Sequence, residues 1–252
     1  MCGRYASTKD PATLAAEFDA VDTTEDLAPP ADHNVAPTKD VVAVVQRHPR
    51  DEQGEPDPTT TMRSLRVMRW GLIPPWAKDR SIGARMINAR SESAATSKAF
   101  KSPLAKRRCL LPADGWYEWR REGKVKQPFF MTAPDGGSLA FAGLWTVWRD
   151  PAEPDGPPVL STTVLTTDAR GQLSDIHDRM PLLMTEEHWA AWLDPDEPDV
   201  GALLTDPPLD LVESLELRPV STKVNNVRNN GPDLLAREEP VVELDLFNLD
   251  QP

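Results

Sequence analysis

The sequence predicts a mixed α+β fold, in which a single domain is built on a curved, barrel-like and mostly antiparallel β core flanked by helices. Short apolar runs, several of them β-branched, recur along the chain and are typical of strands. Helical periodicity is confined to a few segments. The length of 252 residues fits one large domain, and no segment is long enough to separate two. We therefore expect residues 2–252 to form a single domain.

Six apolar runs predict the principal strands of this core. They are residues 41–45, 65–70, 129–132, 139–144, 160–167 and 215–220. Helices are predicted at 11–18, 90–100, 185–192 and 198–204, the first because Pro11 suits a first helical position and the third because Thr185 suits a cap. Three segments rich in Pro, Asp and Glu, at 49–61, 149–158 and 194–208, are expected to be exposed insertions.

Composition excludes several protein classes. No stretch approaches eighteen consecutive apolar residues, which argues against a membrane span, and the first residues lack the pattern of a signal peptide. The two cysteines, Cys2 and Cys109, are too few for a disulfide framework and suit a reducing cytoplasm. No spacing among the four histidines resembles a metal site. We expect a cytoplasmic protein that needs neither a metal nor a cofactor.

Charge is distributed unevenly along the chain, whose formal net charge is -12. Residues 62–108 contain twelve basic and two acidic side chains, whereas residues 186–252 contain four basic and sixteen acidic ones. Exposed charges are screened beyond about 10 Å, so a basic stretch can still bind a polyanion locally. A solvated helix face is the alternative interpretation of this stretch. The excess of acidic residues also favours a halophilic source.

Cys2 is the first candidate for chemistry. A small residue at this position favours removal of Met1, which would leave an α-amine and a thiol on one residue. About a tenth or more of such an amine is neutral at pH 7 and can condense with an aldehyde to a Schiff base. The thiol can then close onto the same carbon and form a thiazolidine. The alternative is a cysteine that acts only as a small apolar residue.

Three other segments could contribute to a reacting site, the first with an Asn that can donate and accept hydrogen bonds and an Arg that suits a phosphate, the other two with groups that can transfer protons. Asn88, Arg90 and Glu92 would share one face of an extended chain. Glu118 would share a strand face with Trp116, and the resulting desolvation would raise its pKa toward the general acid–base range. His177 lies in an irregular segment and could carry protons near neutral pH. A turn, a surface carboxylate and a structural histidine are the respective alternatives.

Two indoles, Trp70 and Trp76, lie within the basic stretch. Aromatic rings beside cationic side chains form platforms for single-stranded nucleic acid, where stacking contributes about 1–3 kcal/mol per base. Core packing is the ordinary alternative for either ring.

These motifs together resemble the SOS response-associated peptidase family, whose members shield abasic sites in DNA. The resemblance rests on eight motifs in one order, which span residues 1–232. They are MCGRYA (1–6), NVAPT (34–38), RWGLIPPWAKD (69–79), INARSE (87–92), RRCLLPADGWYEW (107–119), FAGLW (141–145), IHDRMP (176–181) and VNNVRNNGP (224–232).

The resemblance implies a covalent sensor of abasic sites in single-stranded DNA, acting as a monomer. Cys2 would be the crosslinking nucleophile, and Asn88 would hold the opened sugar or the finished adduct. Glu118 would assist ring opening and Schiff-base formation, and His177 would act as acid or base in closure or reversal. The DNA-binding residues implied by the resemblance are Arg4, Arg90 and Arg179 as phosphate contacts, and Pro37 with Trp70 as a wedge against flanking bases.

Two other functions remain open at this stage. In a cysteine peptidase or self-processing hydrolase, Cys2, Glu118 and His177 would act on a peptide bond, although the chain lacks an evident oxyanion-hole signature. A non-catalytic single-strand binder would depend on the basic stretch and the indoles alone, and would release DNA completely at high salt.

Overall fold

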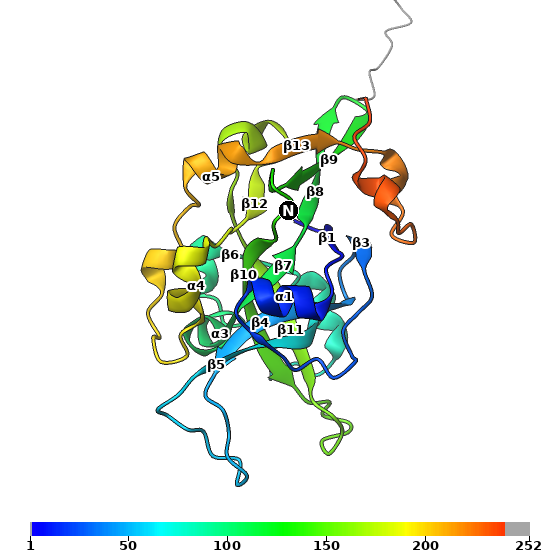
Figure 1. Ribbon diagram of the computed structural model, residues 1–252. Coiled ribbons are helices and arrows are strands. Elements are labelled where there is room, and N and C mark those ends of the chain that lie inside the picture. Colours follow the sequence, from blue (N-terminus) through cyan, green and yellow to red (C-terminus); the bar gives the residue numbers. More distant parts are fainter. Residues whose placement is uncertain (1, 240–252) are drawn as a thin grey trace, which may run out of the picture.

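Two sheets form the core of the computed structural model, which describes residues 2–239 (Figure 1). The first sheet has the order β13-β9-β8-β1-β3. These strands are β13 (Glu216–Pro219), β9 (Val125–Thr132), β8 (Gly115–Glu122), β1 (Tyr5–Ser7) and β3 (Asp32–Val35). Every pairing within this sheet is antiparallel.

The second sheet has the order β12-β11-β10-β7-β4-β5-β2 and closes on itself. Its strands are β12 (Arg179–Pro181), β11 (Val159–Asp168), β10 (Leu139–Trp148), β7 (Arg108–Ala113), β4 (Asp40–Arg47), β5 (Met62–Trp70) and β2 (Val21–Asp22). A parallel pairing of β5 with β11 joins the two sides into a ring, and β6 (Asn88–Arg90) also pairs with β11. The predicted barrel-like, mostly antiparallel α+β fold is confirmed.

Strand β4 shows why the apolar runs are continuous rather than alternating. Val41, Ala43 and Val45 face one buried cluster, whereas Val42 and Val44 face another. The first cluster lies inside the ring and the second lies under the helices, so both faces of the strand are buried. The flanking helices α1 (Pro11–Glu17) and α4 (Glu186–Leu193) cover the second cluster, which includes Phe18 and Trp192.

The predicted helices are only partly confirmed. Helices α1 and α4 form as expected, with Asp10 capping the first and Thr185 preceding the second. The helix predicted at 90–100 is wrong, because residues up to Arg90 pair with β11 and leave the four-residue α2 (Ser91–Ala94). The segment 198–204 forms only a single 3₁₀ turn. The short helices α3 (Lys101–Lys106) and α5 (Leu209–Ser214) were not predicted.

The three predicted insertions differ in their burial. Residues 50–61 are exposed, and residues 149–158 are mostly exposed. Within 194–208, by contrast, Val200 and Pro207 are buried, and Asp206 accepts a hydrogen bond from Thr167 at 2.6 Å. This segment is therefore packed against the domain. None of the helices within residues 2–239 is long and apolar enough to cross a membrane.

The Asp114–Gly115 step moves the chain from one sheet to the other. Residues before it pair in the ring, whereas Gly115 begins β8 and pairs with Ala6 and Thr132 in the first sheet. A Cβ at Gly115 would lie 2.2 Å from the carbonyl oxygen of Met131. The absence of a side chain is thus required for the two sheets to meet at this corner.

Arg108 is a buried cation that fixes residues 194–197, and its removal is expected to destabilise the protein. Its side chain is 4% exposed and donates to backbone carbonyls of Leu104, Trp192, Asp194 and Glu197. Arg108→Met leaves these oxygens without their donor, which should cost about 3 kcal/mol and lower the melting temperature by roughly 6–12 °C.

Calorimetry of this variant should be compared with Lys106→Met, which changes an exposed neighbouring cation. The control is expected to stay within about 0.5 kcal/mol of the wild type. Equal melting temperatures for Arg108→Met and the wild type would contradict the anchoring role of Arg108.

Candidate active site around Cys2

Cys2 lies in the core of the domain, just before β1, and its side chain is fully buried. The Asn88 side chain donates a hydrogen bond from Nδ2 to the Cys2 carbonyl oxygen at 2.8 Å. Asn88 is placed by β6, whose parallel pairing sets Asn88 opposite Val164 of β11. The structure therefore brings together two residues that are 86 positions apart in the chain.

Glu118 is a buried carboxylate that acts electrostatically on the Cys2 thiol. It lies on the same face of β8 as Trp116, and both side chains are almost fully buried, at 3% and 0% exposure. Burial raises the pKa of Glu118 to about 7. Burial also raises the pKa of the Cys2 thiol well above its ordinary value, and the Glu118 carboxylate adds to this effect. Glu118 can thus both donate and accept a proton near neutral pH, next to a thiol that stays protonated.

His177 completes a small group with Glu118. Its Nε2 lies 4.0 Å from Oε2 of Glu118. Burial lowers the pKa of His177, so the ring is mainly neutral at pH 7. Its Nδ1 lies 3.0 Å from the backbone N–H of Arg179 and 2.7 Å from Oδ1 of Asp178. Nδ1 accepts from the Arg179 N–H when it carries no proton, and it donates to Asp178 when it is protonated. His177 therefore has a partner for Nδ1 in either state.

The surroundings of Glu118 and His177 are mainly apolar. The residues that line the narrow cleft here are Trp116, Glu118, Met131, Leu173, Ile176, His177, Arg179 and Met180. An apolar lining limits hydration, which strengthens electrostatic interactions between the titratable groups. This arrangement can move a proton between two groups whose pKa values have shifted toward one another.

Two of the three predicted phosphate contacts are occupied by bonds within the protein. Arg4 donates to Oδ1 of Asn34 at 2.7 Å and to the Val224 carbonyl at 2.8 Å. Arg179 is 8% exposed and forms ion pairs with Glu92, at 2.6 Å, and with Asp168. These guanidinium groups join distant motifs around Cys2.

Arg90 is the third predicted phosphate contact, and it differs from Arg4 and Arg179. Its side chain is exposed at the end of β6, two residues after Asn88. Other exposed cations of the basic stretch, here called the basic surface together with Arg90, are Lys78, Arg80, Arg85 and Lys98. Part of the basic stretch of the sequence thus exposes its positive charges to solvent.

The two indoles of the basic stretch have opposite environments. Trp70 is fully buried, donates from Nε1 to the Ile87 carbonyl at 2.9 Å and packs edge-on against Tyr5. Trp76 is 52% exposed, and Nζ of Lys98 lies 5.1 Å from its ring centroid. A buried ring cannot stack on a base from this position, so the expected wedge role does not suit Trp70. The sequence alone could not distinguish the two rings.

Pro37 lies in a strained turn. The following residue, Thr38, has φ +75°, which is unusual for a β-branched side chain. Two hydrogen bonds hold the turn. The Thr38 N–H donates to the Trp70 carbonyl at 2.8 Å, and the Arg69 side chain donates to the Thr38 carbonyl at 2.7 Å. Strain of this kind is retained mainly at functional sites. The turn therefore supports the interpretation of Pro37 as a functional residue.

Comparison with known proteins identifies the family. The model of the SOS response associated peptidase (SRAP) family matches residues 1–227. The chain belongs to the SRAP family. Residues 2–239 include no group of three or more His, Cys, Asp or Glu side chains that could hold a metal ion.

Curated SRAP proteins include relatives from bacteria and animals. The chain is 35% identical over 251 residues to the abasic site processing protein YoqW of Bacillus subtilis, which covers 93% of this chain and 99% of YoqW. It is 34% identical over 204 residues to the abasic site processing protein HMCES of Gallus gallus, covering 71% of this chain and 59% of HMCES.

Solved structures share the SRAP fold seen here. A protein from Bacteroides thetaiotaomicron superimposes with a TM-score of 0.77 over 94% of this chain and all of that protein, at 21% identity. A protein from Bordetella bronchiseptica gives a TM-score of 0.67 at 26% identity, over 87% of this chain and all of that protein. The first likeness supports the fold alone.

Proposed function

We propose that this SRAP protein captures abasic sites in single-stranded DNA through a covalent bond to Cys2. The observation that carries the proposal is the contact of Cys2 with Asn88, beside a carboxylate whose pKa is near 7. The names of the relatives, which are abasic site processing proteins, point to the same substrate. Removal of Met1 would make Cys2 the first residue and give it a free α-amine.

The reaction has two bond-forming steps. The α-amine of Cys2 attacks the C1′ aldehyde of the opened deoxyribose, and loss of water gives an imine. The thiol sulfur then bonds to C1′, while the thiol proton passes to the imine nitrogen. The product is a five-membered thiazolidine, and no oxidant or metal is consumed. Closure removes the imine before β-elimination can cut the strand.

Proton transfers in these steps are assigned to Glu118 and His177. Glu118, with a pKa of about 7, is suited to donate a proton during sugar opening and loss of water, and to accept one afterwards. His177 is mainly neutral and is suited to accept the thiol proton or return it during reversal. Asn88 would hold the sugar through hydrogen bonds from the part of its amide group that does not contact Cys2.

DNA contacts are assigned by exposure. Arg90, on the basic surface, is proposed to bind a phosphate, and Pro37 to press against a flanking base. Trp76, rather than Trp70, is proposed to stack on a base, because its ring is accessible and lies beside Lys98. Arg4 and Arg179 are proposed to support the site through their internal bonds. Single-stranded DNA fits because an abasic nucleotide must leave a duplex to reach a buried residue.

A denaturing gel tests this function directly. The purified protein is mixed with a single-stranded oligonucleotide containing one uracil, with or without prior treatment by uracil glycosylase. We expect a boiling-stable adduct only with treated DNA, at a mass equal to the protein without Met1 plus the DNA minus one water. Binding that disappears completely at high salt, with no covalent product, would contradict the proposal. Turnover of a peptide without any adduct would favour the peptidase alternative.

A further inference from the structure

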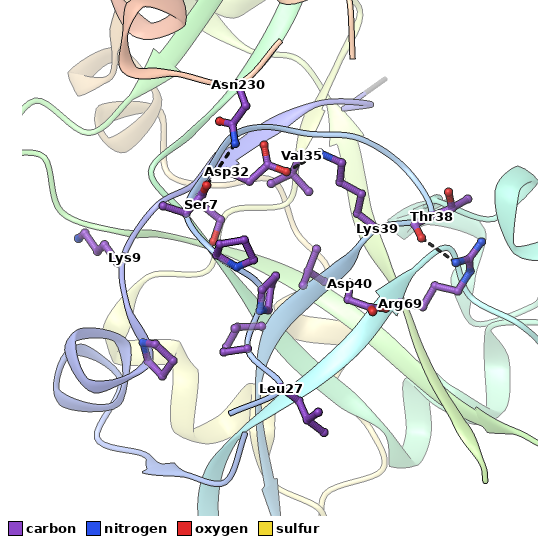
Figure 2. Close-up of a pocket in the computed structure, with 17 residues that line it drawn as sticks. Ser7, Lys9, Leu27, Asp32, Val35, Thr38, Lys39, Asp40, Arg69 and Asn230 are labelled. Carbon is purple, nitrogen blue, oxygen red and sulfur yellow. Dashed lines mark hydrogen bonds and ion pairs between the residues drawn. The ribbon is translucent and has the colours of Figure 1, made fainter. Parts of the chain in front are cut away.

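A cavity of about 610 Å³ opens on the other side of the Pro37–Thr38 turn. Figure 2 shows its walls, which come from the end of β1, the loop before β3, the start of β4 and the end of β5. The apolar part of the wall is formed by Leu27, Pro29, Pro30 and Val41. The volume falls within the range of pockets that hold one nucleotide-sized ligand.

The cavity is connected to the active site through short segments of the backbone. Ser7, in its wall, ends the strand β1 that begins three residues after Cys2. Thr38 and Arg69, also in its wall, are bonded to one another, and Thr38 is bonded to the backbone of Trp70. Val35 and Val41, also in its wall, belong to the same buried cluster as Cys2, so the cavity and the candidate active site share one part of the core.

Arg69 gives the cavity a cationic end. Its Nη1 donates to the Thr38 carbonyl, whereas its buried Nε has no hydrogen-bond partner within the described residues. Burial lowers the pKa of Arg69, and the positive charge of Arg80 lowers it further. The negative charge of Asp40 acts in the opposite direction. Asp40 is the cross-strand partner of Arg69 and partly balances its charge, whereas the unpartnered Nε leaves one donor for a phosphate oxygen.

The rest of the cavity suits the edge and face of a base. Prolyl and aliphatic side chains provide an apolar wall for a planar ring. The side chains of Ser7 and Asp40 provide a hydroxyl and a carboxylate, and carboxylates accept hydrogen bonds from exocyclic amino groups. The Asp32–Lys39 ion pair, at 2.5 Å, leaves little net charge at this end. An apolar wall, a carboxylate and a guanidinium with an unpartnered Nε are the kinds of group that contact the base and the phosphate of a nucleotide.

We propose that this cavity binds an unpaired nucleotide of the same DNA strand, next to the abasic nucleotide held at Cys2. The inference rests on the proposed function. It adds a second recognition point that holds a base with its phosphate near Arg69. A base taken into the cavity cannot remain paired or stacked on its neighbour, so the protein would distinguish single strands from duplexes on one side of the lesion.

The experiment uses single-stranded oligonucleotides with one abasic site and 2-aminopurine at one of the two positions on either side. We expect one position alone to become protected from acrylamide quenching when the wild-type protein binds. Ala31→Trp places an indole in the cavity from an exposed loop position, so folding should be retained. This variant is expected to lose the protection and to crosslink about tenfold more slowly at limiting protein concentration. Ala152→Trp, at an exposed position in the 149–158 segment, is the matched control.

A shortened oligonucleotide that ends before the protected position provides the second measurement. On the shortened DNA, the crosslinking rate of the wild type should fall to about the rate of Ala31→Trp on the full-length strand. The rate of Ala31→Trp should be the same on both DNAs. Equal quenching at all four positions, or slowing by Ala31→Trp on the shortened DNA as well, would overturn the pocket assignment. Absence of an adduct with the wild type would contradict the proposed function instead, and quenching would still test the cavity.

Discussion

Cys2→Ala is expected to abolish the boiling-stable adduct completely, because the variant has no sulfur to close the ring. It should still have an α-amine at the same position after removal of Met1. The imine can therefore form, but it hydrolyses during denaturation unless it is reduced. We expect borohydride to trap the Cys2→Ala protein on abasic DNA, and strand cleavage by β-elimination to exceed that of the wild type.

Cys109→Ala is the matched control for this prediction. Cys109 is the second cysteine of the chain and is also fully buried, but its sulfur contacts Thr162 at 3.3 Å inside the ring of strands. This variant should form the adduct at the wild-type level, provided that circular dichroism shows it folded. A boiling-stable adduct with Cys2→Ala would require a different nucleophile, and failure of borohydride trapping would show that the Cys2 amine does not reach the sugar.

Glu118→Gln is expected to slow adduct formation by about 100- to 10,000-fold, the usual contribution of a general acid–base group. Glutamine keeps the size of the side chain but cannot transfer a proton. The wild-type rate should change slope near pH 7, where Glu118 titrates, and the variant should lack this feature. Single-turnover gels between pH 5 and pH 9 measure both effects. Glu52→Gln, in the exposed segment 49–61, should behave as the wild type.

Stability measurements separate a catalytic from a structural role of Glu118. Its pKa is raised from 4.5 to about 7 by folding, so the native state binds more protons between these values, and the stability of the wild type falls as pH rises across that window. Glu118→Gln has no titrating group at this position, so its stability should not fall in this window. Above pH 7 it should be more stable than the wild type by roughly 1–3 kcal/mol. A rate within threefold of the wild type, or lower stability of Glu118→Gln at pH 9, would contradict the assignment.

The local pattern of the chain was sufficient to predict most strands, and it is also the source of the chemistry that we propose for Cys2. The apolar runs identify strands because both faces of the ring are buried, which needs no knowledge of the partner strand. Strand alternation also places Trp116 and Glu118 on one face, and both line the same cleft. The aminothiol proposed for Cys2 would depend only on one residue and its position after Met1.

The tertiary structure decided which members of each residue class reach solvent. Trp70 and Trp76 lie in one motif, yet one is buried under Tyr5 and the other is half exposed. Arg179 lies in a matching motif, but carboxylates from distant segments occupy its guanidinium group. The helix expected at 90–100 was lost because pairing with β11 outweighed local propensity.

The difference has one physical reason. Backbone periodicity and the chemistry of a single side chain are local properties, because they depend on only a few consecutive residues. Burial, ion-pair partners, pKa shifts and the cavity beside Pro37 depend on contacts between segments that are far apart in the chain. Such contacts are fixed only when the ring of strands closes and the first sheet packs against it.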